Sequence, residues 1–412
     1  MTRFLFFFLS RLVRYGHLEI RTADGETQIF GDGSGPRLVV KLADRAAERR
    51  LSLDPELAFG ELFMDGRLDL VEGDLYELVE LGARNLAAYK KPGWIKLLQR
   101  ARIAFRRLHQ RNDRVRARRH ISQHYDLDQR MYRLFLDSDW QYSCAYFEHP
   151  GQSLDEAQLA KKRHLASKLL IDERHSVLDI GCGFGGMALY LAQMAGARAT
   201  GVTLSQEQLE VATRRAGAAG LADRVDFRLQ DYRDVAEQFD RIISVGMFEH
   251  VGVNGYDEYF ATARRLLKDD GVMLLHAIGR NSVPGATNPW IRKYIFPGGY
   301  IPSLSEVLPA VERAGLYVTD IEILRLHYAE TLRAWRERFM ARWDDAAKLY
   351  DERFCRMWEF YLAGSETSFR VDGNMVWQLQ LAKRNEVVPL TRDYIAEREA
   401  ELRHREAARP GV

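Results

Sequence analysis

Apolar positions in the second half of the chain follow two alternating periods. Short apolar runs predict strands at 177–180, 199–203, 225–229, 241–245, 272–278 and 317–324. Helical spacing between the runs predicts helices at 186–195, 206–216 and 256–267. Strands that alternate with helices are typical of an α/β fold with a parallel, doubly wound sheet. Because ligands of such sheets bind beyond the carboxyl ends of the strands, the residues that follow each strand are the first candidates for a site.

The first 90 residues have a different pattern. Short apolar segments predict strands at 18–21, 27–30 and 37–42, and helical spacing predicts helices at 55–64 and 74–83. We therefore expect the following parts: a small N-terminal α+β domain over 1–93, a basic helical connection over 94–120, a catalytic domain over 121–390 and a charged C-terminal helix or tail over 391–412.

Composition sets bounds on this picture. Of the 412 residues, 46% are hydrophobic and 29% are charged, which indicates a globular chain and not wholesale disorder. The formal net charge of +2 is too small to indicate a partner. Three widely spaced cysteines, Cys144, Cys182 and Cys355, suit a reducing compartment and neither a disulfide framework nor a zinc site. No apolar run approaches the ~18 residues of a spanning helix, so a cytoplasmic protein is expected.

A glycine-rich turn follows the apolar strand 177–180. Glycines are needed where the backbone turns sharply or a ligand approaches the main chain. Gly181, Gly183 and Gly186 match the dinucleotide fingerprint, whereas Gly181, Gly183 and Gly185 match the looser loop of S-adenosylmethionine enzymes. A tight turn without a ligand is the third alternative. The next strand ends in 201–205 without the acidic residue that usually binds the ribose of a dinucleotide, which counts against a nicotinamide cofactor.

Several short segments occur along the chain in a characteristic order. They are His124-Tyr125-Asp126, Tyr142-Ser143-Cys144-Ala145-Tyr146-Phe147, Leu178-Asp179-Ile180-Gly181-Cys182-Gly183, Gly201-Val202-Thr203-Leu204-Ser205, Glu249-His250-Val251-Gly252, Leu275-His276-Ala277-Ile278-Gly279, Phe296-Pro297-Gly298-Gly299, His327-Tyr328 with Thr331-Leu332 and Trp335, and Phe369-Arg370. Together they resemble the cyclopropane-fatty-acyl-phospholipid synthase family, which includes the mycolic acid cyclopropane synthases and related methyltransferases. The resemblance covers roughly residues 120–385, and the small domain before them also resembles the family's phospholipid-acting members.

The resemblance implies a class I methyltransferase (Rossmann-like) fold with S-adenosylmethionine as methyl donor. The positions that match the donor site are Tyr142, Ser143, Val177, Asp179, Gly181, Cys182, Gly183, Gly185, Thr203, Leu204, Ser205, Gln208, Tyr232 and Arg233. It also implies a bicarbonate ion in the active site. The positions that match the ion site are Cys144, Glu249, His276, Ile278 and Tyr328.

The chemistry explains why a methyltransferase of this kind needs such residues. An alkene attacks the methyl group of a sulfonium ion, and ring closure then requires a base beside a cation in a site that excludes water. A bound bicarbonate can be that base. Backbone N–H groups near Cys144 and Ile278, the His276 ring and the Tyr328 hydroxyl can donate to the ion, and Glu249 can accept its O–H. Aromatic faces can stabilise the cation, and the candidates are Tyr146, Phe147, Trp290, Tyr294 and Phe296.

Each of these residues also has a purely structural alternative. In an apolar strand, His276 would by default be a hydrogen-bonded core histidine, and Glu249 can cap the helix that follows it. Tyr328 can simply pack, whereas Cys144 and Cys182 can be small buried residues. Residues 281–303, rich in proline and aromatic side chains, are expected to cover the acyl chain, the alternative being a surface loop with its own small core.

The implied substrate, a membrane phospholipid, predicts peripheral contact with the inner membrane surface. Two segments are candidates for it. Leu5, Phe8, Leu9, Leu12 and Val13 would share a helix face, with Phe4 and Phe7 beside it and Arg3, Arg11 and Arg14 available to phosphates. The arginine-rich segment 100–119 can add attraction to anionic lipid, the alternatives being a solvated face or a dimer contact. No nucleic-acid-binding motif accompanies it. Whether the chain forms a homodimer is left open.

The sequence thus predicts an enzyme that adds a methylene from S-adenosylmethionine across a cis double bond of a phospholipid acyl chain. A close alternative within the same family methylates such a chain without closing the ring. An NAD-dependent oxidoreductase and a catalytically silent lipid-binding protein are the alternatives from other classes. The missing acid near Thr203 counts against the first, and the presence of Glu249, His276 and Tyr328 together counts against the second.

Overall fold

The structure, a computed structural model, describes residues 2–89 and 128–408. The described residues form two compact units. One, the four-stranded unit, comprises residues up to 89 together with 287–297 and 329–374, and the other, the seven-stranded unit, comprises 128–286, 298–328 and 375–408. Each unit is therefore built from separate segments of the chain, and no single boundary in the sequence divides the two. The predicted basic connection 94–120 and the motif His124-Tyr125-Asp126 lie outside the described residues.

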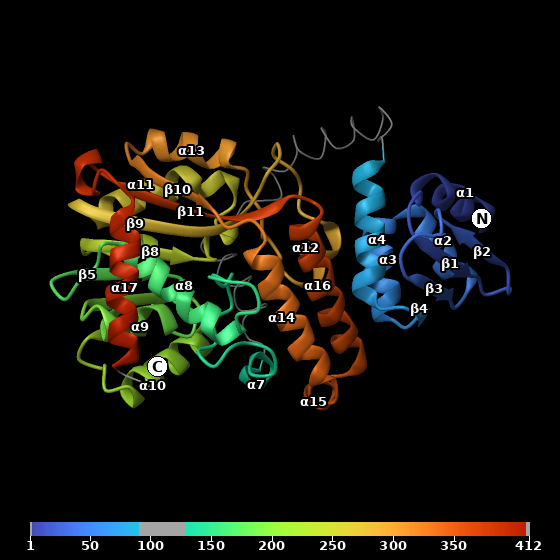
Figure 1. The fold of residues 1–412 in the computed structure, drawn as a ribbon, viewed down its shortest axis with the longest axis horizontal. Helices are drawn as coiled ribbons and strands as arrows, with labels where there is room; N and C mark the ends of the chain where they lie inside the picture. The colour runs from blue at the N-terminus through green and yellow to red at the C-terminus, as the bar shows by residue number, and fades with distance from the viewer. Residues whose placement is uncertain (1, 90–127, 409–412) are drawn as a thin grey trace. The chain divides into compact units, whose positions relative to one another are not determined.

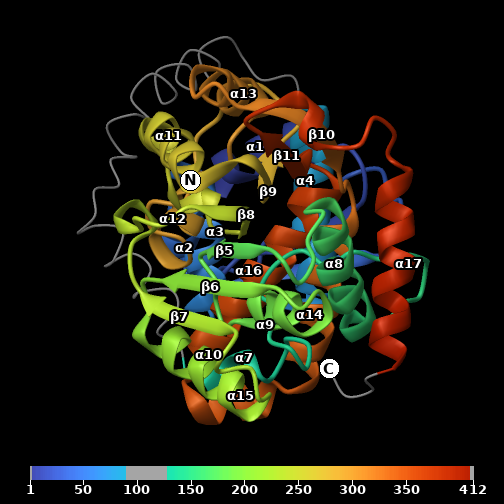
Figure 2. The ribbon, with the colours of Figure 1, turned by 90° about the vertical axis from the view of Figure 1, so that its left-hand side faces the viewer.

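The seven-stranded unit contains one sheet, in the order β10-β11-β9-β8-β5-β6-β7 (Figures 1 and 2). Its strands are β5 (Ser176–Ile180), β6 (Arg198–Thr203), β7 (Val225–Leu229), β8 (Phe239–Val245), β9 (Leu267–Arg280), β10 (Tyr317–Ile323) and β11 (Asn374–Ala382). Neighbouring strands from β9 to β7 pair in parallel, and Figure 2 shows β8, β5, β6 and β7 side by side. β10 pairs antiparallel with β11. The α/β class predicted from the sequence is confirmed, and β11 is a strand that the sequence pattern did not predict.

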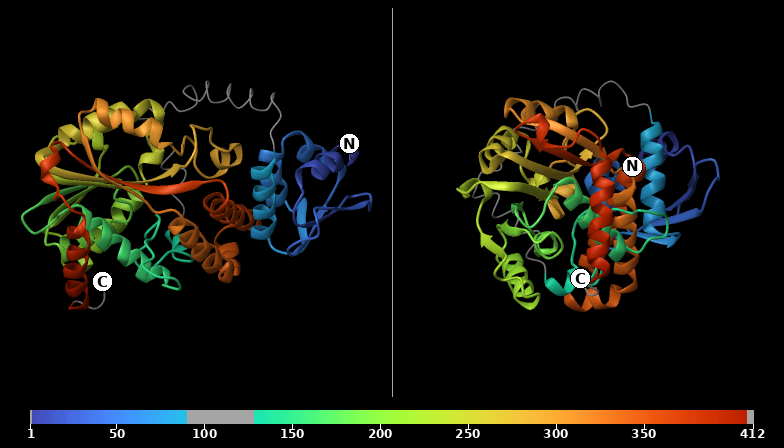
Figure 3. Two further views of the ribbon diagram at one scale, coloured as in Figure 1. Left: turned by 45° about the horizontal axis from the view of Figure 1, so that its top comes forward. Right: turned by 60° about the vertical axis from the view of Figure 1, so that its left-hand side comes forward.

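Helices cover both faces of this sheet. One face packs against α11 (Tyr256–Leu266) and α13 (Leu304–Arg313). The other packs against α8 (Leu154–Lys168) and α9 (Gly186–Met194), with α10 (Gln206–Ala218) against β7 and α17 (Asp393–Ala407) alongside α8 (Figures 1 and 3). The short elements are α7 (Gln129–Tyr132), η1 (Tyr232–Asp234), η2 (Phe248–His250), η3 (Val253–Gly255) and η4 (Asn385–Val387).

The two faces of the sheet differ in polarity at β9 and β11. Because side chains alternate along a strand, Leu275 and Trp377 belong to the apolar cluster beneath α11 and α13. His276 and Gln378, one position further, lie on the opposite face, where α8 packs. Most of α8 is buried, including its lysines, so this face carries buried polar groups that must pair with one another.

The four-stranded unit has a sheet in the order β2-β1-β3-β4. Its strands are β1 (His17–Arg21), β2 (Thr27–Phe30), β3 (Arg37–Leu42) and β4 (Leu68–Glu72), and its helices are α1 (Thr2–Leu12), α2 (Arg45–Leu53), α3 (Pro55–Met64), α4 (Leu75–Ala88), α12 (Pro289–Tyr294), most of α14 (His327–Ala341), α15 (Trp343–Leu349) and α16 (Glu352–Arg370). The five elements predicted between 18 and 83 are all present. α4 begins with a capping box in which Asp74 and Glu77 each accept from the other's backbone N–H.

The first helix corrects an expectation about the membrane. The sequence placed Leu5 and Val13 on a face that meets a bilayer, but both are buried in the core of the four-stranded unit. A periodic apolar face identifies a buried surface without saying what buries it. Phe4 and Phe7, predicted beside that face, are more than half exposed.

Candidate active site

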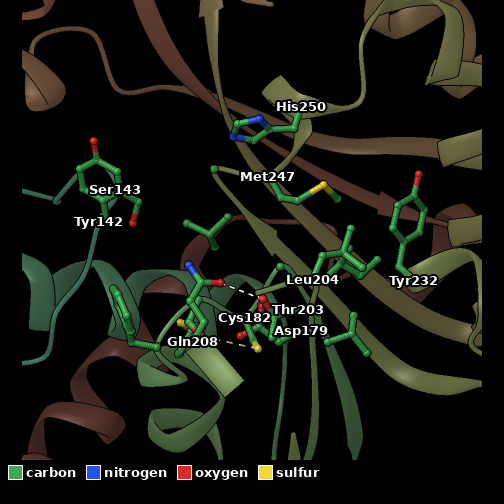
Figure 4. A pocket seen from close by; sticks show the side chains of 18 of the residues that line it. Tyr142, Ser143, Asp179, Cys182, Thr203, Leu204, Gln208, Tyr232, Met247 and His250 are labelled. Carbon is green, nitrogen blue, oxygen red and sulfur yellow. Dashed lines mark hydrogen bonds between the residues drawn. The ribbon is translucent and has the colours of Figure 1, made fainter. Parts of the chain in front are cut away.

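A pocket opens at the carboxyl ends of β5, β6, β7 and β8 in the seven-stranded unit. The predicted donor-site residues that line it are Tyr142, Ser143, Asp179, Gly181, Cys182, Gly183, Thr203, Leu204, Gln208, Tyr232 and Arg233. In Figure 4, Tyr142 and Ser143 lie across the pocket from Tyr232. The strand-end rule therefore located the pocket, and the structure brings most of the predicted donor-site residues to it.

Three predicted donor-site residues do not line this pocket. Val177 is fully buried in the core of the sheet. Gly185 is the N-cap of α9, and Ser205 is the N-cap of α10, where its Oγ accepts from the backbone N–H of Gln208 at 3.3 Å. These residues build the strand and the helix starts that surround the pocket.

The backbone of the glycine loop adopts left-handed φ angles, which residues with a side chain rarely adopt. Gly181, Gly183 and Gly185 have φ values of +80°, +54° and +82°. A Cβ at Gly181 would lie 2.8 Å from Met247, and one at Gly185 would lie 2.6 Å from the ring of Phe227. A Cβ at Gly183 would meet no atom within 4 Å, so this glycine faces the open space of the pocket. The loop is thus a cradle in which a ligand can reach the backbone.

A buried lysine supports one wall of the pocket. Nζ of Lys161 on α8 donates to Oε1 of Gln141 at 2.6 Å and to Oγ of Ser143 at 2.8 Å. Burial lowers the pKa of Lys161 to about 8. Burial also raises the pKa of Asp179 to about 7 despite the opposing charge of Lys161, and among the described residues Oδ2 of Asp179 has no hydrogen-bond partner. The sequence did not predict Lys161, because nothing in the pattern of α8 separates a buried lysine from an exposed one, and it did not predict its partner Gln141 either.

An ion cluster ties the same wall to the glycine loop. Asp139 pairs with Lys162 at 2.7 Å and with Arg215. The guanidinium of Arg215 also donates to the backbone oxygen of Phe184 at 2.7 Å. Although burial opposes it, the charges of Lys162 and Arg215 hold the pKa of Asp139 below its usual range. The spacing between the wall and the loop is thus fixed by charge-assisted hydrogen bonds.

Asp231 is a pocket residue that the sequence reasoning missed. It follows β7, is buried and accepts from Nε of Arg233 at 2.9 Å and from its terminal nitrogen at 2.6 Å. Arg233, predicted to contact the donor, therefore has its guanidinium committed to Asp231. The signal was present, because Asp231 comes two residues after the end of a predicted strand. His250 and Met247, which follow β8, were found only by the structure (Figure 4).

The predicted ion site lies at the end of β9. Oε1 of Glu249, on η2, accepts from the backbone N–H of Ile278 at 2.7 Å. We expected this N–H to face the ion, but in the structure it positions the carboxyl group. Oε2 of Glu249 is buried and has no hydrogen-bond partner among the described residues. Burial raises the pKa of Glu249 to about 7 even though the Ile278 N–H lowers it.

His276 lies two residues before Ile278 and therefore on the same side of β9. Its Nδ1 is 3.2 Å from Nε2 of Gln378. Burial, together with the positive charges of Lys161 and Lys168, lowers the pKa of His276 well below its ordinary value. His276 is thus a neutral, buried ring, and among the described residues its Nε2 has no hydrogen-bond partner.

The other two predicted ion ligands are also buried in the seven-stranded unit. The thiol of Cys144 donates to the backbone oxygen of Ala145 at 3.2 Å, so Cys144 is held by its own neighbour. Tyr328 is buried at the start of α14. Tyr146, a candidate for stabilising the cation, is stacked between the rings of His164 and His327 at 4.2 and 5.0 Å.

Three further aromatic candidates belong to the four-stranded unit. Trp290 is buried there, and its ring lies 4.6 Å from that of Phe360. Tyr294 donates to Oε1 of Glu61 at 2.8 Å, and Phe296 packs edge-on against Tyr361. The aromatic side chains of 287–297 thus build a core within this unit, and a cover over the acyl chain stays a prediction.

The fold and the site define a class of protein. The strand order, the glycine loop after β5 and the pocket beside it are those of a class I S-adenosylmethionine-dependent methyltransferase. A family model described as mycolic acid cyclopropane synthetase matches residues 112–379, and the chain belongs to this family. A second model, described as a domain of unknown function, matches residues 8–91.

Several known proteins are similar to this chain. The cyclopropane-fatty-acyl-phospholipid synthase of Escherichia coli K12 is 39% identical over 81% of this chain and 85% of its own length. The tuberculostearic acid methyltransferase UfaA1 of Mycobacterium tuberculosis is 37% identical over 89% of this chain and 88% of its own. The crystal structure of mycolic acid cyclopropane synthase CmaA1 complexed with SAH and CTAB matches with a TM-score of 0.61 at 33% identity, covering 64% of this chain and 97% of that one.

Proposed function

We propose that the protein transfers a methylene group from S-adenosylmethionine to the cis double bond of an unsaturated phospholipid acyl chain and forms a cyclopropane ring, with bound bicarbonate as the general base. The observation that carries this proposal is the buried carboxyl group of Glu249 near the donor pocket, one oxygen of which has no hydrogen-bond partner within residues 2–89 and 128–408. The 39% identity to the E. coli synthase supports the reaction.

The pocket has the features that the methyl donor needs. Gly183 leaves open space for a ligand against the backbone, and Tyr142, Ser143, Thr203, Gln208 and Asp231 offer side chains that can hold its polar groups. When bound, S-adenosylmethionine supplies an electrophilic methyl group on a sulfonium centre. Asp179 also lines the pocket, and a positively charged ligand nearby would favour the ionised form of its carboxyl group.

The ion site fits bicarbonate because it offers both kinds of hydrogen-bonding group. Oε2 of Glu249 can accept the O–H of the ion, and a donor on the His276 ring can hold one of its other oxygens. Burial of both groups excludes water, which would otherwise quench a cation formed on the acyl chain. A small ion that is both donor and acceptor therefore complements Oε2 of Glu249 and the His276 ring nitrogen, neither of which has a hydrogen-bond partner among the described residues.

The substrate class leads us to propose that the protein acts in the cytoplasm at the inner membrane surface as a peripheral protein. Phe4 and Phe7 are exposed on α1, and Arg11 and Arg14 are exposed nearby. Within the described ranges, no helix combines the length and apolarity needed to cross a bilayer. Lipid or dimer contacts of the N-terminal segment, and the homodimer itself, stay predictions from the sequence.

One assay tests the reaction. Purified protein is incubated with methyl-labelled S-adenosylmethionine and vesicles of cis-unsaturated phospholipid, with bicarbonate supplied or depleted, and the fatty acids are analysed by mass and by ozonolysis. We expect acyl chains that gain one CH₂ and resist ozonolysis. We expect this product to form only when bicarbonate is supplied. Unlabelled lipid would overturn the proposed reaction, and label incorporation independent of bicarbonate would overturn the proposed base.

A second product is the alternative within the same family. The 37% identity to the tuberculostearic acid methyltransferase supports a methyl-branched acyl chain made without ring closure. Which product forms depends on where the base lies relative to the cation. The same assay separates them, because a branched chain that keeps its double bond is cleaved by ozone and a cyclopropane is not.

A further inference from the structure

A chain of buried polar side chains leads away from the proposed ion site. Gln378 on β11 is fully buried and contacts two charged or titratable groups at once. Nζ of Lys168 donates to Oε1 of Gln378 at 2.9 Å, and Nε2 of Gln378 lies 3.2 Å from Nδ1 of His276. Neither Gln378 nor Lys168 has a part in the reaction described so far.

Hydrogen-bond chemistry fixes the direction of this chain. An ammonium group can only donate, so the oxygen of the Gln378 amide must face Lys168. The amide nitrogen then faces His276 and, since it too can only donate, Nδ1 of His276 must accept. A neutral imidazole whose Nδ1 accepts carries its proton on Nε2. The charge on Lys168 therefore dictates the tautomer of His276 across the glutamine.

Lys168 is itself held in place. It forms ion pairs with Glu322 and, at 3.6 Å, with Asp320. Glu322 also accepts from His164 at 2.7 Å, and the other nitrogen of His164 pairs with Glu399 at 2.6 Å. Although burial opposes it, these two carboxylates raise the pKa of His164. The ion pairs with Glu322 and Asp320 thus hold Lys168 in place, with its ammonium group in contact with Gln378.

We propose that Gln378 is a positioning residue that holds His276 as the Nε2–H tautomer, so that the ring donates to the anion bound beside Glu249. This inference rests on the proposed function, because it assumes an anion at that place. The opposite tautomer would direct a lone pair at the anion and repel it. The second ring nitrogen of His276 supports the assignment as well. Its Nε2 has no hydrogen-bond partner among the described residues and is therefore available to a ligand.

Gln378→Glu is the sharpest test. The new side chain has nearly the same shape and, ionised beside the Lys168 ammonium group, still accepts from it. The second oxygen of this carboxylate can only accept, so the proton must move to Nδ1 of His276. In the full-length protein labelled with ¹⁵N-histidine, we expect His276, assigned by comparison with His276→Asn, to be Nε2–H in the wild type and Nδ1–H or doubly protonated in the variant. We expect kcat to fall roughly 10- to 100-fold. The dissociation constant of S-adenosylhomocysteine should not change, because neither residue lines the donor pocket.

Two further comparisons keep the test independent of folding. Gln380→Glu places the same change two residues further on the same face of β11, where the Gln380 side chain contacts the backbone oxygen of Lys168, Tyr394 and Thr319 and makes no hydrogen bond to His276. It should leave the His276 tautomer and kcat per folded molecule unchanged. If Gln378→Glu does not fold, Lys168→Met should give mixed tautomers, whereas Lys168→Arg, which keeps a donor, should keep the Nε2–H form.

An Nδ1–H ring in wild-type protein, or an unchanged kcat in Gln378→Glu, would overturn the inference. These outcomes can be distinguished from a failure of the proposed function. A wild-type protein with the Nε2–H ring that labels no lipid would refute the reaction and leave the tautomer assignment standing. An active protein with the Nδ1–H ring would do the reverse.

Discussion

The backbone N–H of Ile278 donates to Oε1 of Glu249 at 2.7 Å, and Oε2 of the same carboxyl group has no hydrogen-bond partner in the part of the chain that the structure describes. One contact thus orients the carboxyl group while the second oxygen stays available. A buried, unpaired carboxyl oxygen is costly, which is why such a group in a protein interior indicates a ligand or a catalytic role.

Replacing Glu249 with Gln should slow turnover and spare donor binding. The amide keeps an oxygen for the Ile278 N–H but presents N–H groups where the O–H of the proposed bicarbonate would need an acceptor. Losing one preorganised contact of this type typically costs ~2–4 kcal/mol in the transition state. The measurement is kcat at saturating donor, with S-adenosylhomocysteine affinity by calorimetry and the exposed Glu173→Gln as control. Wild-type turnover in Glu249→Gln would contradict the role of this carboxylate.

The pH dependence of Glu249 should appear in both activity and stability. Since the role requires the ionised form and its pKa is raised to about 7, activity should rise with pH through that region, and Glu249→Gln should lack this rise. The folded pKa exceeds the value of 4.5 expected in the unfolded chain, so the folded state binds more protons between these values and loses stability as pH rises through them. The full effect is about 3 kcal/mol. Denaturant unfolding at pH 5 and pH 8 should show this loss in the wild type, and an equal loss in the Gln variant would assign it to another group.

Two glycine substitutions should separate ligand binding from folding. Gly183→Ala adds a methyl group toward open pocket space and forces a left-handed backbone conformation, at a cost of about 1–2 kcal/mol. We expect weaker donor binding in a protein that still folds. Gly185→Ala pays the same backbone cost and also clashes with Phe227 and Ala212, so it should lower the melting temperature more. Calorimetric titration and thermal unfolding measure the two effects, and equal donor affinity in Gly183→Ala and wild type would rule out ligand approach at this glycine.

Lys161→Met should weaken donor binding, because Lys161 supports the pocket wall formed by Gln141 and Ser143. The substitution keeps most of the side-chain volume but leaves Gln141 and Ser143 without their shared donor, which typically costs about 1–3 kcal/mol for unsatisfied buried groups. We expect lower affinity for S-adenosylhomocysteine and a lower melting temperature. Lys348→Met, at a largely exposed position, is the matched control. Unchanged affinity would show that the wall keeps its shape without the lysine.

Exposed aromatic side chains on α1 should contribute to vesicle binding. Deletion of the first helix would remove Leu5 from a core, so the test is the double variant Phe4→Ser/Phe7→Ser. If these side chains enter the lipid interface, co-sedimentation with anionic vesicles should weaken roughly tenfold or more. Leu53→Ser, at another exposed apolar position of the same unit, controls for the loss of apolar surface. Equal losses in both variants would exclude a specific lipid contact of α1.

The sequence predicted those parts of the site that depend on local backbone geometry. The left-handed turn at Gly183 follows from the glycine spacing after a strand, and Asp179 and Thr203 lie at strand ends that apolar periodicity marks. Asp231 was within reach of the same reasoning. Glu249 and His276 were proposed as site residues only through the order of motifs, since a buried carboxyl group with a catalytic role and a helix cap look alike in a sequence, and their roles stay predictions.

What only the tertiary structure decided is which polar groups are buried and with what they pair. The pattern of α8 is that of a charged helix, yet Lys161 and Lys168 are fully buried because partners from distant segments, Ser143 and Gln378 among them, satisfy their ammonium groups. The same holds for Leu5, whose apolar character predicted a buried surface but not the core that buries it. Local pattern thus determined the elements and the loop, whereas the pairing of charges and the choice of partner depend on contacts between residues far apart in the chain.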